Sequence, residues 1–162
     1  MSPRSPRLLS RGSDAMPTDV PHLLAAGRLE AVPPDLTSAR ARLARAARHL
    51  ETSAKLRGQD NDMAYAALYD AARKAVTAHM LANGLRVPAR VGAHEAIGVY
   101  AADSISDDTG AVREFQRMRR RRNKSEYEDI LVGDQDIDTD LVHAGHIVAA
   151  VEAAPHSDDN SG

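Results

Sequence analysis

The sequence predicts an all-α protein, an up-and-down bundle of four to five helices. Alanine supplies 29 of the 162 residues, and alanine, leucine and arginine are strong helix formers. The β-branched and aromatic residues that favour strands are sparse, and aromatic residues make up only 3% of the chain. Apolar residues recur at helical spacing in five segments, and the short connections between them favour antiparallel neighbours in a bundle.

The first predicted helix begins near Thr37 or Ser38, either of which can cap it, and runs to about Arg57. Four arginines lie around this helix, which predicts a basic flank that is solvated rather than bound to RNA (Arg40, Arg42, Arg45 and Arg48). The second helix follows the turn 58–61 and ends at the stop pair 83–84. Asp70 and Arg73 lie beside its apolar side, where either could face inward.

Three further helices complete the expected bundle. One runs from about Ala93 to Ile105, and the next begins at residues 107–109 and reaches about Ile130. Gly133 and an acidic loop over residues 134–138 end it, and the last helix covers roughly residues 139–153. No convincing strand is found, so we expect a single helical domain over residues 17–154.

The two ends of the chain read as disordered segments. Residues 1–16 contain Ser-Pro-Arg twice and no acid before Asp14, and residues 155–162 form a polar, acidic tail. The arginines and serines of the head are also typical of a transit peptide, but Pro3 and Pro6 interrupt an amphipathic helix. We favour a start at Met16 instead, and expect a cytoplasmic protein.

Composition excludes several classes of function. The chain has no cysteine, which excludes disulfides, thiolate metal sites and a cysteine nucleophile. The sequence contains no stretch of about 18 apolar residues, so it predicts no membrane-spanning helix. A net charge of −2 argues against a surface that is cationic throughout, so an anion site must be local. Motifs for zinc, calcium and phosphate-binding glycine loops are missing, and we expect no metal and no cofactor.

The most informative feature is a charged run in the fourth helix. Residues 113–122 hold six arginines and one acid, a local charge of +5, and residues 126–140 hold seven acids and no base. The arginines could simply be solvated or paired with these acids. At roughly 100° per residue, however, Arg119, Arg122 and Glu126 project within roughly 60° of Phe115, which faces the core. Because buried charges are costly unless paired or used, we expect this end of the helix to face a cleft or a second subunit.

The run from Phe115 to Tyr127 resembles the motif helix of HEPN domains, which are four- to five-helix bundles of toxin–antitoxin, defence and RNA-processing systems. Their signature is an arginine, usually followed by a polar residue, and a histidine after four to six intervening residues. Arg122 and Asn123 match its start, but Tyr127 stands where the histidine would be. Further similar stretches bring the resemblance to roughly residues 36–153 (Tyr65, residues 69–74, 84–86 and 92–94).

The resemblance implies a homodimer in which two motif helices form one cleft that binds single-stranded RNA and, in active members, cleaves it without metal. It assigns Arg122 to phosphate stabilisation, Asn123 to orientation and Arg119 to a second phosphate contact. Tyr127 occupies the position of the catalytic proton carrier, although a phenol is a poor base at neutral pH. We expect Arg73 to support this site. We also expect Asp70 or Glu126 to hold Arg119 and Arg122 in place by bidentate pairing.

The missing histidine leaves the activity open. His49, His79 and His94 lie on other segments from which they could approach the cleft. The resemblance also implies a nucleotidyltransferase-type antitoxin as a partner, but position 129 is Asp where modified relatives carry a tyrosine, so that modification is not carried over.

Three functional hypotheses follow from the sequence. The first is an RNA-binding protein or endoribonuclease toxin of the HEPN group. The second is an interaction module of the same fold, whose polar stripe only specifies how two subunits pair. The third is a helical sensor with a site for a small anionic ligand.

Overall fold

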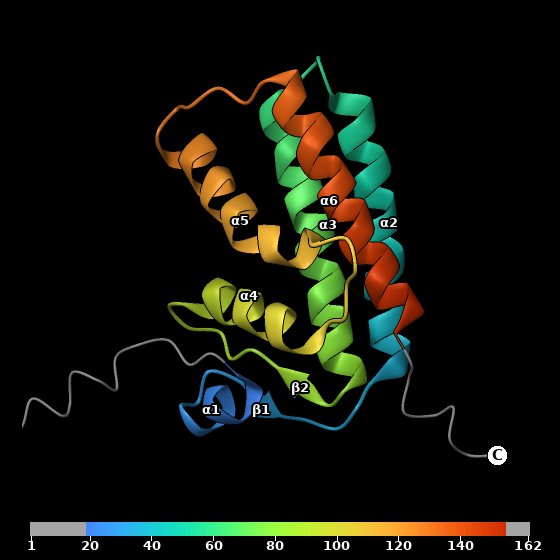
Figure 1. Ribbon diagram of the computed structural model, residues 1–162, viewed down its shortest axis with the longest axis vertical. Helices are drawn as coiled ribbons and strands as arrows, with labels where there is room; N and C mark the ends of the chain where they lie inside the picture. Colours follow the sequence, from blue (N-terminus) through green and yellow to red (C-terminus); the bar gives the residue numbers. More distant parts are fainter. Residues whose placement is uncertain (1–18, 155–162) are drawn as a thin grey trace, which may run out of the picture.

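The computed structural model describes residues 19–154, and these residues form six helices and one short antiparallel ribbon (Figure 1). The all-α prediction is confirmed. The predicted head over residues 1–16, the start at Met16 and the tail over residues 155–162 lie outside the described residues. In chain order the elements are α1 Val20–Ala25, β1 Glu30–Ala31, α2 Leu36–Leu56, α3 Asn61–Ala82, β2 Leu85–Arg86, α4 Ala93–Ser104, α5 Ala111–Tyr127 and α6 Asp134–Ala153.

Helix α3 lies at the centre of the molecule and contacts α2, α4, α5, α6 and β2. Figure 1 shows α2, α3 and α6 side by side, with α4 and α5 extending from one side of this layer. The ribbon and α1 lie at the end of the bundle next to α4, and α1 packs on α4. The α4–α5 pair therefore packs against the α2–α3–α6 layer through α3 and, for α5, also through α6.

The core combines small and large buried side chains. Alanines on α2 and α3 are fully buried, among them Ala46, Ala64 and Ala72, and they allow the two helices to approach closely. The larger core side chains come from α3, α4, α5 and α6 (Leu68, Met80, Tyr100, Phe115, Met118, Ile137 and Ile147). Between residues 19 and 154, no helix combines the length and the apolar character that crossing a bilayer requires.

A buried carboxylate joins three helices. Asp140 of α6 is 1% exposed and accepts hydrogen bonds from the Tyr65 hydroxyl of α3 at 2.8 Å and from the Arg117 guanidinium of α5, whose Nη1 lies 3.1 Å away. The hydrogen bond to Asp140 raises the pKa of Arg117, and burial with the same carboxylate raises the pKa of Tyr65. One turn farther along α5, Arg121 contacts Asp136. These contacts fix one face of α5 against α6.

Several helix boundaries differ from the sequence prediction, among them the start of α5, which lies at Ala111 and not at residues 107–109. Helix α2 begins at Leu36, because the Asp35 carboxylate accepts the Ser38 N–H at 2.9 Å and caps it one turn earlier than expected. Helix α5 ends at Tyr127 rather than near residue 130. The predicted acidic loop 134–138 is instead the first turn of α6, where carboxylates are favourable beside the positive end of the helix.

The segment before α2 contains structure that the sequence did not predict. Leu23 of α1 and Leu29 are buried, and β1 pairs with β2 so that Glu30 faces Arg86. Gly84 connects α3 to this ribbon with φ of +72°, and a Cβ there would lie 2.8 Å from the Val32 carbonyl oxygen. The close approach of two backbones explains why this turn needs glycine.

Candidate nucleic-acid interface

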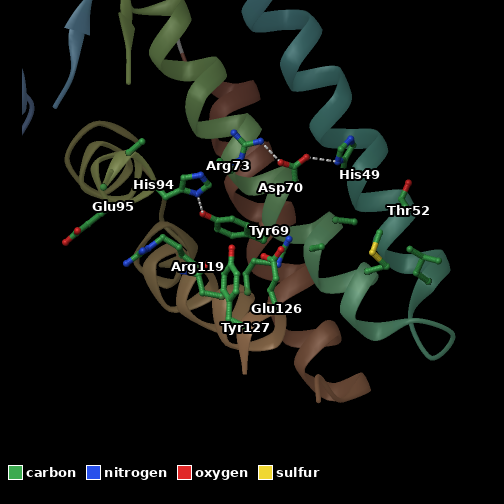
Figure 2. Close-up of a pocket in the computed structure, with 18 of the residues that line it drawn as sticks. His49, Thr52, Tyr69, Asp70, Arg73, His94, Glu95, Arg119, Glu126 and Tyr127 are labelled. Atoms are coloured by element: carbon green, nitrogen blue, oxygen red, sulfur yellow. Dashed lines mark hydrogen bonds and ion pairs between the residues drawn. The ribbon is translucent and has the colours of Figure 1, made fainter. Parts of the chain in front are cut away.

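An open cleft of about 970 Å³ lies between α2, α3, the first turn of α4 and the second half of α5 (Figure 2). The structure brings all seven predicted site residues to this one cleft. They are Asp70 and Arg73 of α3 and Arg119, Arg122, Asn123, Glu126 and Tyr127 of α5. Their functional roles remain predictions, whereas their convergence is a property of the fold.

Helix α5 directs two arginines into the cleft because of its periodicity. Phe115 and Met118 are fully buried and fix the inward face of the helix, and Arg119 and Arg122 continue that face. The Arg122 guanidinium donates to the Glu126 carboxylate at 2.5 Å, as expected for a pair four residues apart. In the described part of the chain, Arg119 has no carboxylate within 4.0 Å.

Gln116 positions the Arg119 guanidinium. Its side-chain oxygen accepts from Arg119 Nε at 2.9 Å, and its amide nitrogen donates to the Glu95 carbonyl of α4 at 3.1 Å. The Gln116 side chain lies directly on Gly98, where a Cβ would come within 2.1 Å of the amide nitrogen. Arg119 is therefore oriented by a neutral amide that spans from α5 to α4.

Asp70 organises the opposite side of the cleft. Its carboxylate accepts from Arg73 at 2.5 Å and from Lys74 at 2.7 Å, and His49 Nδ1 of α2 lies 3.0 Å away. Burial by itself raises the pKa of Asp70, but the hydrogen bonds from Lys74 and Arg73 outweigh it and lower that pKa.. Of the two carboxylates expected to hold the α5 arginines, Glu126 pairs with Arg122, whereas Asp70 pairs with cations on its own helix.

His94, in the first turn of α4, enters the cleft from a third direction. Its Nδ1 lies 3.0 Å from the Tyr69 hydroxyl, and the two rings are stacked with centroids 6.3 Å apart. Burial raises the pKa of Tyr69 to about 12, so its hydroxyl stays protonated at neutral pH. Burial also lowers the pKa of His94, and the nearby Arg73 and Arg119 lower it further.

Asn123 and Tyr127 lie at the rim. Both are exposed, and the Tyr127 side chain is 78% exposed at the end of α5. Figure 2 places Tyr127 beside Arg119 and below Tyr69. The position that corresponds to the family histidine is therefore open to solvent and to any second molecule that covers the cleft.

Of the three histidines on other segments, the structure brings two to the cleft and not the third. His49 and His94 line it, whereas His79 hydrogen-bonds the Tyr100 hydroxyl at 2.7 Å elsewhere in the molecule. The sequence signals for His94 were its place near a predicted helix start and in the stretch 92–94 that is similar to the family. Within residues 19–154 no cluster of three or more histidine and acidic residues is arranged to hold a metal ion.

The groups around this cleft suit a phosphodiester. Four arginines line it, Arg73 on α3, Arg119 and Arg122 on α5, and Arg90 in the segment before α4. Guanidinium groups match phosphate oxygens in geometry as well as charge. The cleft also offers an imidazole at His94 and amide groups at Asn123. A family model described as the HEPN domain matches residues 39–154.

The chain belongs to the HEPN domain family. The matched range agrees with the 36–153 expected from the sequence, and it contains every residue that lines the cleft. Comparison with curated proteins and with solved structures finds no match. The HEPN assignment is consistent with an RNA-related or nuclease-like role.

Proposed function

We propose that this HEPN protein binds single-stranded RNA, with the phosphate backbone in the cleft between α3, α4 and α5. The observation that carries the proposal is Arg119, a half-buried guanidinium that is oriented by Gln116 and left without a carboxylate among residues 19–154. A partly buried charge without a counter-ion is costly unless a ligand supplies one. A phosphate group is the ligand that its neighbours Arg73 and Arg122 also fit.

Each predicted residue has a role in this proposal. Arg119 and Arg122 contact phosphate oxygens, and Arg73 adds a third positive charge from α3. Asn123 orients the backbone through its amide, Glu126 holds Arg122, and Tyr127 donates a hydrogen bond from the rim. Because the cleft has few aromatic rings on which bases could stack, recognition relies on the backbone and tolerates different sequences.

The proposal includes a homodimer in which two clefts face each other. The rim of the cleft and the segment after α5 expose large apolar side chains: Met63 is 56% exposed, Tyr127 78% and Leu131 90%. Exposed apolar side chains that gather beside a polar cleft are typical of an interaction surface. A second copy would cover them and enclose the RNA between two α5 helices.

RNA binding can be tested with a fluorescent single-stranded oligonucleotide. We expect the double variant Arg119→Ala, Arg122→Ala to weaken binding by at least about tenfold, since a hydrogen bond to a charged group contributes about 1.5–3 kcal/mol. The slope of log K against log salt should fall by about 1.4 for two lost phosphate contacts on a single strand. Arg120→Ala is the matched control, because Arg120 is exposed on α5 and does not line this cleft. Equal affinities for wild type and the double variant would contradict the proposal.

Growth of expressing cells tests whether RNA binding makes the protein a toxin. We expect wild type to slow growth, Arg122→Ala to relieve the effect, and a co-expressed nucleotidyltransferase-type antitoxin to neutralise the wild type. If the protein dimerises but binds no RNA, the interaction-module hypothesis replaces this one. Binding of a small anion without RNA would favour the sensor.

A further inference from the structure

We propose that His94 is the general base of an RNA-cleaving site in this cleft, and that Tyr69 positions it. This inference rests on the proposed function, because it requires RNA in the cleft. It assigns to a residue of α4 the proton transfer for which the motif helix α5 has no histidine. The inference therefore adds a catalytic base to the phosphate-binding residues proposed above.

The geometry fixes the imidazole of His94 against a rigid support. Tyr69 is 5% exposed, and its ring packs on Phe115 with centroids 5.6 Å apart, so the hydroxyl that contacts His94 Nδ1 cannot move freely. With Nδ1 bound to Tyr69, Nε2 is the nitrogen left to meet a ligand. When Nδ1 carries the proton and donates to the Tyr69 oxygen, Nε2 presents a lone pair, as a base requires.

The charges around His94 favour its neutral form. It lies in the first turn of α4, near the positive end of that helix, where a cationic imidazole is disfavoured. Burial lowers the pKa of His94 and nearby arginines lower it further, against the opposing effect of Asp70. The ionisable neighbours that share this part of the cleft are Tyr69, Asp70 and Arg73 on α3, Arg119 and Arg122 on α5, Glu95 on its own helix, and Arg90 in the segment before α4.

The step we propose is attack of an RNA 2′-hydroxyl on the adjacent phosphorus. The O2′–P bond forms as the P–O5′ bond breaks, and the 2′-hydroxyl proton passes to Nε2 of His94. Water supplies a proton to the leaving O5′, so the products are a 2′,3′-cyclic phosphate and a 5′-hydroxyl. Arg119 and Arg122 stabilise the charge that develops on the phosphoryl oxygens. Every bond and proton is accounted for without a metal or a cofactor.

His94 is better placed for this role than the other groups of the cleft. The His49 Nδ1 is already in contact with the Asp70 carboxylate, on the far side of Arg73 in Figure 2. Tyr127 is mostly exposed at the rim. His94 is held by a buried hydrogen-bond partner, Tyr69, and lies near Arg119 in the same cleft (Figure 2).

The inference is tested by comparing cleavage with binding in the full-length protein. Single-turnover cleavage of end-labelled RNA is measured in EDTA, and affinity is measured separately with 2′-O-methyl RNA, which cannot react. We expect His94→Gln to slow cleavage by about 10²- to 10⁴-fold, the usual contribution of a general base. Its affinity for 2′-O-methyl RNA should stay within about twofold of wild type. His146→Gln is the control, because His146 is exposed on α6 and lines no part of this cleft.

The pH profile distinguishes a base from a structural residue. The wild-type rate should rise with pH to a plateau, with a midpoint below the ordinary imidazole pKa of 6.5, because the neutral form reacts. This rise should be lost in His94→Gln. In Tyr69→Phe, which keeps the ring and removes the hydroxyl, the rate should fall and the midpoint should move.

Each outcome bears on a different claim. Wild type that binds RNA but never cleaves it would overturn this inference and leave the proposed function intact. Cleavage by His94→Gln at the wild-type rate would overturn it as well. Wild type that binds no RNA would overturn the proposed function, and the inference with it.

Discussion

Gln116 shows how much of the cleft depends on one neutral side chain. The amide contacts Arg119 with its oxygen and the α4 backbone with its nitrogen, and it does so where Gly98 leaves room for it. An arginine in this position has several flexible torsions, and ordering them in advance reduces the entropic cost of binding a phosphate. The affinity of the cleft should therefore depend on residues that never touch RNA.

Gln116→Ala should weaken RNA binding about 2- to 10-fold, because one hydrogen bond contributes about 0.5–1.5 kcal/mol. Gly98→Ala should act in the same direction, since its Cβ displaces the Gln116 side chain. Titration of labelled single-stranded RNA measures both effects. Gln135→Ala, on the exposed start of α6, should bind like wild type. Unchanged binding by both Gln116→Ala and Gly98→Ala would show that Arg119 needs no support.

Individual residues of the cleft differed in how far the sequence could predict them. The inward direction of Arg119 and Arg122 followed from helical periodicity alone, because Phe115 fixes the face of the helix. The partners of Asp70 did not follow, since which of several nearby cations a carboxylate meets depends on helix packing. His94 could not be placed for the same reason, because its approach depends on how α4 crosses α3.

At the scale of the element, α5 sorts its arginines by face. Arg117 and Arg121 point to the acids of α6, Arg119 and Arg122 point into the cleft, and Arg120 is exposed. Both interpretations of the charged run therefore apply, each to a different face of α5: one face pairs with acids, and the other lines the cleft. The sequence contained both, but the assignment of residues 134–138 to a loop concealed Asp136 as the partner of Arg121.

Asp140→Asn should destabilise the protein by about 1–3 kcal/mol, because the Arg117 guanidinium and the Tyr65 hydroxyl lose their buried carboxylate and Arg117 keeps only its pair with Glu114. Urea unfolding followed by circular dichroism measures the change. Asp136→Asn is the comparison, since the pair it forms with Arg121 is partly exposed and should contribute less than about 1 kcal/mol. Similar losses in the two variants would contradict a special role for the buried carboxylate.

Asp107 lies just before α5 and accepts the backbone N–H groups of Thr109 and of Val112 in the first turn of the helix, each at 3.0 Å. Burial raises the pKa of Asp107, but these hydrogen bonds and that from the Thr109 hydroxyl lower it overall. A carboxyl group with a lowered pKa stabilises the fold above its unfolded value near 3.8, and that contribution is lost as the pH falls through the lowered value.

Asp107→Ala should therefore cost about 1 kcal/mol at neutral pH, the usual effect of losing a cap. The difference from wild type should shrink as the pH falls below about 3.8, the unfolded pKa of an aspartate. Urea titrations at several pH values check this. A difference that stays constant down to pH 2 would mean that the charged carboxylate is not the source of the stability.

At the scale of the whole molecule, the bundle was predictable because long periodic segments leave little choice of fold class. The helix before residue 36 and the ribbon were not, since their apolar content is small and their stability comes from packing on α4 and from the turn at Gly84. The start of α6 was missed because acids near a helix terminus resemble a loop in composition.

The proposed dimer predicts an oligomeric state that can be measured directly. Light scattering at micromolar concentration should give twice the mass of the 17.4 kDa chain. Leu131→Asp and Met63→Asp should shift the protein towards a monomer and weaken RNA binding, because a charge would be buried in the interface. Val142→Asp, at an exposed apolar position on α6, should leave both unchanged. A wild-type monomer at these concentrations would contradict the shared cleft.

Tyr69 belongs to two environments at once: its ring is core and its hydroxyl faces the proposed ligand. The same residue, Tyr69, thus contributes both to the stability of the core and to the proposed RNA-binding site. If heat or a distant cavity loosens the packing of the core, the position of the His94 imidazole should change as well. Evolution of this cleft is consequently constrained, since improving it through Tyr69 means repacking Phe115 at the same time.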